Sequence, residues 1–163
     1  MVAKYGAMEV NIDKELLFMN WEFLKPYDIM ELESESSIEE FEKEIGYTFP
    51  EDFKDFVRHC NGASFEKECF DVDIEEIGTT DFRPYSFNRT DSISVWRLSG
   101  FDVTDEELKE IAKKYIDIAD TSFGDLICYN VTDNHLYFID HETLEIVKLA
   151  DTFTEFSNML YED

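Results

Sequence analysis

Basic residues are scarce in this chain of 163 residues. Lysine and arginine together number 14 against 39 aspartates and glutamates, which gives a formal net charge of −25. A protein that binds nucleic acid needs a basic surface to displace counterions from the phosphates, and no basic stripe interrupts the acids here. We therefore expect no nucleic-acid partner. The partner that this charge favours is cationic: a basic protein surface or, as a second choice, a divalent metal.

Cysteine is rare as well. The chain has Cys60, Cys69 and Cys128, an odd number without CxxC spacing. That pattern is typical of reduced thiols in the core of a cytoplasmic protein rather than of a disulfide framework. No apolar run approaches the length of about 18 residues that a membrane-spanning helix needs, and the N-terminal sequence lacks the apolar stretch of a signal peptide. We therefore expect a cytoplasmic protein without a membrane partner.

Linkers, internal repeats and low-complexity segments are missing too, and the chain has only 3 prolines and 6 glycines. A chain of this length suits one domain with one continuous core. Apolar residues make up 44% and aromatic residues 15%, including 15 phenylalanines, which predicts a core rich in aromatic contacts. We expect a single domain over residues 1–163, with residues 1–20 partly flexible.

Helix start and stop signals are clear in four places. A capping box at Ser37 predicts a helix that ends at Gly46, and Pro50 begins a second helix that ends at Asn61. With a loop of about four residues between them, the two helices are predicted to form an N-terminal αα-hairpin. Capping boxes that begin at Thr104 and Thr152 predict a third helix and a C-terminal helix.

Strand signals fill the second half of the chain. Residues 126–130 and 136–140 flank a five-residue loop, residues 145–149 follow a second turn, and residues 115–120 lead into this meander. Residues 70–74 alternate between apolar and acidic side chains, and residues 92–96 fit either a strand or a helix. The predicted fold is α+β: an antiparallel sheet with the helices segregated to one side.

Catalytic motifs are absent. The sequence contains no GxSxG elbow, HExxH, Walker loop or GxGxxG. Cys60 follows His59, but adjacent helical residues point about 100° apart, so a core thiol is the favoured interpretation. Carboxylate pairs arise by chance among so many acids, and the run Glu39–Glu44 is typical of a solvated helix face. We expect no catalytic residue; a hydrolase that uses carboxylates remains the less favoured alternative.

A metal site deserves separate consideration. His135, Asp140, His141 and Glu142 cluster around one predicted strand, with Asp133 nearby, and imidazole with carboxylate can hold a divalent ion. His135 and His141 flank that strand, however, and would lie about 17–20 Å apart, so one ion cannot take both. A polar turn is the favoured interpretation, and we expect no metal and no cofactor.

A helix-turn-helix for DNA is the other candidate, over residues 38–62. Its second helix would present acids (Glu51, Asp52 and Asp55), against which only Lys54 and Arg58 carry positive charge. Repulsion from the phosphates would outweigh any base contact, which excludes this interpretation.

The same segment resembles the signature of the SUKH superfamily, which includes yeast cell-wall assembly regulators and many bacterial immunity proteins. The residues that carry the resemblance are Ile38, Phe41, Glu42, Ile45, Gly46, Phe49, Pro50, Asp52, Phe53, Phe56, Asn61 and Gly62. Later runs follow in the family's order: Ser86-Phe87-Asn88, Ile118-Ala119-Asp120, Phe123-Gly124-Asp125 with Ile127-Cys128, and Asp151 with Phe153 and Phe156. Phe49 stands where an aliphatic residue is more usual, and the first 20 residues have no counterpart.

The resemblance implies an α+β fold without catalytic activity. Bacterial members are mainly cytoplasmic proteins that bind and neutralise a cognate toxin, frequently a nuclease. Our leading hypothesis is therefore an immunity-type protein that binds a cationic toxin domain. The alternative is a regulatory or scaffolding module in a cell-envelope or signalling assembly. In both cases the motif residues are interpreted as structural, with the partner bound elsewhere.

Overall fold

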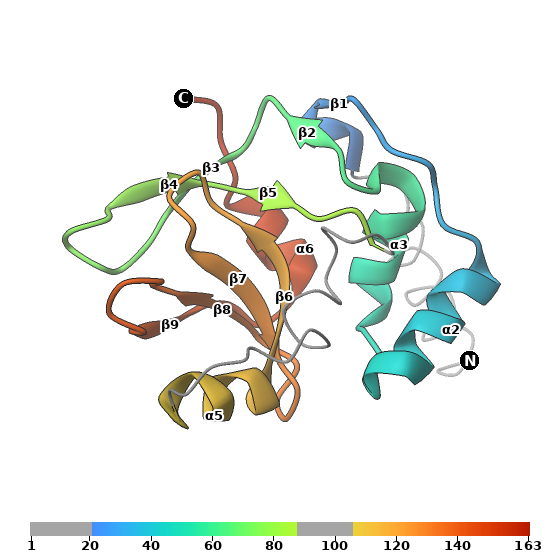
Figure 1. Ribbon diagram of the computed structural model, residues 1–163. Helices are drawn as coiled ribbons and strands as arrows, with labels where there is room; N and C mark the ends of the chain where they lie inside the picture. The colour runs from blue at the N-terminus through green and yellow to red at the C-terminus, as the bar shows by residue number, and fades with distance from the viewer. Residues whose placement is uncertain (1–20, 88–105) are drawn as a thin grey trace, which may run out of the picture.

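The computed structural model describes residues 21–87 and 106–163 (Figure 1). A five-stranded antiparallel sheet in the order β5-β6-β7-β8-β9 forms its centre. Its strands are β5 (Arg83–Pro84), β6 (Tyr115–Asp120), β7 (Leu126–Asn130), β8 (Leu136–Ile139) and β9 (Ile146–Ala150). Two short antiparallel pairs add β1 (Pro26–Tyr27) with β2 (Ser64–Phe65), and β3 (Cys69–Asp71) with β4 (Thr79–Asp81).

The helices vary in length. They are the 3-10 turn η1 (Trp21–Leu24) and the α-helices α2 (Glu35–Ile45), α3 (Glu51–Cys60), α5 (Glu106–Lys114) and α6 (Phe153–Asn158). Among the described residues, every helix is too short or too polar to span a bilayer. The mixture of helices with an antiparallel sheet confirms the predicted α+β class.

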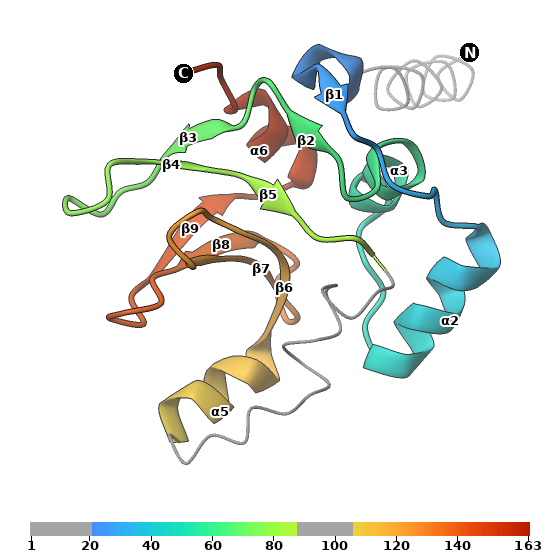
Figure 2. The same cartoon turned by 45° about the horizontal axis from the view of Figure 1, so that its top comes forward.

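The two faces of the sheet are covered differently. Apolar residues of α2, α3 and α6 join one large core with side chains of the central strands, such as Ile116 and Phe138. Helix α5 contributes Ile111 to a second, smaller cluster with Tyr115 and Cys128. Figure 2 shows α5 and α6 on opposite sides of the sheet. The prediction that the helices lie on one side thus holds for α2, α3 and α6 but not for α5.

The helix boundaries are close to those predicted, with two shifts. Helix α2 is capped by Ser34, whose hydroxyl accepts a hydrogen bond from the Ser37 amide, so its cap lies three residues before the predicted one. Pro50 is the N-cap of α3 rather than its first helical residue. Both ends are as predicted: Gly46 and Gly62 have φ of 71° and 62°, in the left-handed region that favours glycine.

An αα-hairpin is not confirmed as the arrangement of α2 and α3. Helix α3 packs mainly on η1 and α6. The ring of Phe56 lies 5.4 Å from that of Trp21 and 4.6 Å from that of Phe153, centroid to centroid, and Phe53 lies 5.2 Å from Phe153. These edge-on and tilted contacts form the aromatic core that the phenylalanine content predicts, and each adds about 0.5–1.5 kcal/mol to the effect of burial.

The strand predictions for the meander are confirmed. Strands β6 and β7 cover the predicted residues, β8 ends one residue earlier, and β9 begins one residue later. Thr152 caps α6 through a hydrogen bond from the Glu155 amide, 3.0 Å. The register of β6 on β7 shifts between Asp117 and Ala119, which marks a bulge. The predictions for residues 92–96 and for the cap at Thr104 lie outside the described residues.

Candidate functional site

A pocket of about 380 Å³ lies where three loops meet at one end of the sheet. The loops are the β6–β7 turn, the β8–β9 turn and the loop between β3 and β4. The residues that line the pocket are Glu76, Ile77, Thr79, Phe123, Asp125, Asp140, His141 and Glu142. Carboxylates dominate this set, and Phe123 is the most exposed large apolar side chain of the described residues, at 70%.

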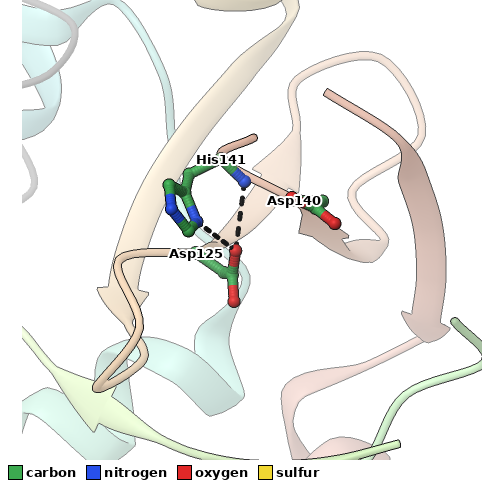
Figure 3. A group of neighbouring side chains, drawn as sticks. All are labelled: Asp125, Asp140 and His141. Atoms are coloured by element: carbon green, nitrogen blue, oxygen red, sulfur yellow. Dashed lines mark hydrogen bonds and ion pairs between the residues drawn. The ribbon is translucent and has the colours of Figure 1, made fainter. Parts of the chain in front are cut away.

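Asp125 and His141 connect two of these turns (Figure 3). One carboxylate oxygen of Asp125, Oδ1, accepts hydrogen bonds from the His141 backbone amide at 3.0 Å and is 2.7 Å from Nδ1 of the His141 ring. Its other oxygen accepts from the Thr121 hydroxyl at 3.2 Å. Gly124, with φ of 91°, turns the chain so that Asp125 points inward beneath the imidazole. The buried carboxylate therefore holds the β6–β7 and β8–β9 turns together.

The electrostatics of this contact favour the charged imidazole. The hydrogen bond that the His141 ring donates to Asp125 raises the pKa of His141 above its ordinary value, and partial desolvation opposes that shift. The Nε2 atom of His141 lies 3.8 Å from a carboxylate oxygen of the exposed Glu142. The positive charge of His141 is thus surrounded by acids, and the pocket as a whole stays negative.

Asp140 stabilises the β8–β9 turn in which it lies. Its Oδ1 accepts hydrogen bonds from the backbone amides of Glu142, at 2.8 Å, and Thr143, at 3.2 Å. Its carbonyl accepts from the Leu144 amide at 2.8 Å, and Leu144 adopts a φ of 61° to close the turn. An aspartate that binds the amides two and three residues ahead is the usual way to fix such a turn.

Asp125, Asp140 and His141 nevertheless bring one ligand atom each within 4.8 Å of the others, a donor set that could hold a divalent ion. The sequence pointed to Asp140, His141 and Glu142; it missed Asp125, because the contact joins residues sixteen positions apart. However, Asp125 Oδ1 and His141 Nδ1 already bind each other, and Asp140 Oδ1 binds two amides. Both Oδ1 atoms are thus engaged in fixing the turns, and we assign the group to turn structure.

His135 lies apart from this group. It precedes β8 whereas His141 follows it, as the sequence predicts, and its Nδ1 is 3.7 Å from an oxygen of Asp133 and 3.6 Å from one of Asp151. It lines a separate pocket of about 290 Å³ beside Pro50 and Asp52. His135 and His141 therefore line two different pockets.

The candidate nucleophile Cys60 is buried in the core. Burial raises the pKa of its thiol to about 12, so the thiol is protonated at neutral pH and a poor nucleophile. The neighbouring His59 ring is directed to Asp55 instead: Nδ1 lies 2.8 Å from the Asp55 carbonyl oxygen and 3.4 Å from a carboxylate oxygen. These contacts support a structural thiol at Cys60.

Helix α3 does not offer its acids and bases to DNA. Asp55, predicted to face outward, is buried at 1% exposure, where it accepts a hydrogen bond of 2.7 Å from the indole nitrogen of Trp21. Lys54 is ion-paired with Glu51, at 3.5 Å, and the Arg58 guanidinium contacts both Glu51 and Glu35. The bases on this helix are therefore neutralised within the protein, which strengthens the case against a DNA-reading helix.

Glu42 is a second buried acid that sequence reasoning placed on a solvated face. Its carboxylate accepts a hydrogen bond of 2.7 Å from the Phe49 amide and lies 3.8 Å from the Lys54 ammonium. It fixes the loop between α2 and α3. The signal was present in the sequence, because Glu42 lies four residues after Ile38 and three before Ile45, on the buried stripe of α2.

Comparison with known protein families places most of this chain in one of them. The model of the SMI1 / KNR4 family (SUKH-1) matches residues 33–159. No curated protein matches the chain significantly. The matched region includes α2, α3, the meander and all of α6.

Proposed function

We propose that this chain, which belongs to the SMI1 / KNR4 family (SUKH-1), is an immunity-type protein that binds and neutralises a cognate toxin domain in the cytoplasm. The family has immunity-type and regulatory roles, both of which work through protein partners. The observation that supports the immunity role is the net charge of −25. A toxin that cleaves nucleic acid must be basic around its active site, so an acidic inhibitor is complementary to it.

The ion pairs of the described residues support this proposal. Basic side chains are engaged by acids on the same surface: Lys25 with Glu162, Lys113 with Glu110, and Lys148 with Asp151. The acids that remain give the surface its charge, and a cationic partner would meet little repulsion from the protein's own bases. Self-repulsion among the unpaired acids opposes the compact state, so the excess of acids is not explained by folding.

The test is co-expression with each candidate toxin domain encoded in the reading frames beside this gene. We expect the protein to rescue growth and to form a complex with a catalytically inactive toxin variant, whose association rate falls as salt rises. If the protein neither binds nor neutralises any neighbouring toxin domain, the proposal is wrong. A pull-down that instead returns several unrelated host proteins would favour the regulatory or scaffolding module.

A further inference from the structure

Exposed apolar side chains concentrate in the connection between β1 and α2. Residues 27–32, here called the 27–32 segment, read Tyr-Asp-Ile-Met-Glu-Leu and are all classed as exposed. The exposed fractions are 49% for Tyr27, 46% for Ile29, 39% for Met30 and 52% for Leu32. Contiguous apolar surface of this kind on a folded protein marks a place where another molecule binds.

The backbone of this segment is fixed, although the side chains of Tyr27, Ile29 and Leu32 are about half exposed. The Met30 amide donates to the Asn61 carbonyl at 2.9 Å, and the Asn61 side-chain amide donates to the Glu31 carbonyl at 2.7 Å. The Asn61 side-chain oxygen accepts from the Phe87 amide at 2.9 Å, which anchors Asn61 itself in the interior. A rigid apolar surface loses little conformational entropy when a partner covers it, so it is prepared for binding.

Charge decides what kind of partner would cover the segment. Acids alternate with the apolar residues at Asp28 and Glu31, and α2 continues the acidic surface with the exposed Glu39 and Glu40. A second copy of this chain would bring another charge of −25 to the interface, and an anionic membrane would be repelled in the same way. A basic protein surface that carries an apolar patch would match both the exposed apolar side chains and the acids between them.

We infer that the 27–32 segment, with the adjoining face of α2, is the docking surface for this cationic protein partner. The inference rests on the proposed function and adds where the toxin domain binds. Ile29 and Leu32 act as apolar anchors at the centre, and the acids around them bind lysine and arginine at the rim, which is the usual anatomy of a tight interface. The pocket beside His141 is a separate surface at the end of the sheet.

The experiment compares two apolar-to-serine variants of the full chain. The test variant is the double substitution Ile29→Ser with Leu32→Ser; the control is Phe123→Ser, which removes a more exposed apolar side chain from the β6–β7 turn. In Figures 1 and 2 that turn and the β1–α2 connection lie on opposite sides of the molecule. The probe is a candidate toxin domain from a neighbouring reading frame, inactivated at its active site, and the measurement is its Kd by calorimetry.

We expect the Ile29/Leu32 variant to weaken binding by about 30-fold or more, the size of one hot spot, and Phe123→Ser to leave Kd within about twofold. Both variants should keep the wild-type melting temperature because the side chains are exposed. Equal Kd for wild type and the Ile29/Leu32 variant would overturn this surface while leaving the proposed function intact. A wild-type dimer that the same variant converts to a monomer would also overturn the assignment, because the segment would then bind a second copy of this chain. Absence of binding by the wild-type protein would refute the proposed function itself.

Discussion

The aromatic cluster around α3 and the 27–32 segment use similar apolar side chains in opposite ways. Phe53, Phe56 and Phe153 are almost completely buried and contact one another, whereas Ile29 and Leu32 are about half exposed. The two regions are separated only by Asn61 and Gly62, which end α3 and hold the segment. The buried side of this boundary carries the family motif, and the exposed segment lies just before the residues that the family model matches, 33–159. In our proposal, the fold and the partner are therefore specified by different residues.

Phe56→Ala tests the buried side of the comparison and should have the largest effect. Removal of this ring leaves a cavity between Trp21 and Phe153, at a cost of about 3–5 kcal/mol out of a total stability of about 5–15 kcal/mol. Urea denaturation measures the loss, with Phe123→Ala as the exposed control. A stable Phe56→Ala protein that has selectively lost its partner would show that the motif itself makes the contact.

Asp117 is an ionisable side chain in the buried part of the molecule. It is 3% exposed, and burial raises the pKa of its carboxyl to about 7, although a hydrogen bond with Tyr85 opposes the shift. The folded state therefore holds this proton more tightly than the unfolded chain does. Its contribution to stability is present below about pH 4 and is lost as the pH rises to about 7.

Asp117→Asn should remove that dependence on pH. We compare the free energies of unfolding of the wild type and the variant. The wild-type value minus the variant value should fall by at most about 4 kcal/mol between pH 4 and pH 8, because the pKa of Asp117 rises from 3.8 to about 7 and each pKa unit corresponds to about 1.4 kcal/mol. Denaturation curves at several pH values measure this difference. Asp73→Asn, at an exposed position, is the control for loss of one charge; a constant difference across the range would contradict the assignment.

Gly62→Ala tests the boundary itself. At φ of 62° an alanine is strained by about 1–2 kcal/mol, and its Cβ would lie 2.6 Å from the Met30 sulfur, so the Met30 side chain must move. Gly78→Ala is a close control, because Gly78 has φ of 66° but nothing within 4 Å of the added carbon. Of the two variants, we expect only Gly62→Ala to weaken binding of the toxin domain. Equal Kd values for the two variants would show that the position of the Met30 side chain does not affect binding.

Charge reversal on α2 should have the smallest effect on stability. Glu39→Lys with Glu40→Lys changes exposed acids, so the melting temperature should stay within about 2 °C while the association rate falls about tenfold at low salt. The matched control reverses the exposed Glu75 and Glu76 on the loop between β3 and β4. Stopped-flow kinetics distinguish them. A larger effect at Glu75 and Glu76 would place the partner near the His141 pocket instead.

Local signals in the sequence predicted most of the fold. The meander could be predicted because strands β7 and β8 are bounded by turn residues at each end, and Gly46 and Gly62 mark helix ends through backbone geometry alone. The start of α2 was placed late because Ser34 and Ser37 both precede acids, and only the structure shows which hydroxyl accepts the amide bond. The side of the sheet that α5 covers depends on tertiary packing and has no local signal.

The candidate sites were harder to predict for the same reason. Asp125 meets His141 only because two turns meet at one end of the sheet, and Asp55 is buried only because Trp21 donates to it from η1. Both are contacts between residues far apart in the sequence. The 27–32 segment gives no local signal, since six residues without periodicity do not reveal whether their apolar side chains point inward or outward.

Asn61 has a consequence for the order of folding. Its three hydrogen bonds reach Met30, Glu31 and Phe87, across separations of 26 to 31 positions along the chain. We expect these bonds to form only after α3 has formed and packed. Bringing together residues that are so far apart in the chain costs entropy, and contacts already made must offset that cost. The surface that we assign to the partner would then be complete only in the fully folded molecule. An incompletely folded chain would be unable to bind its toxin, and a bound toxin would in turn protect the folded chain from unfolding.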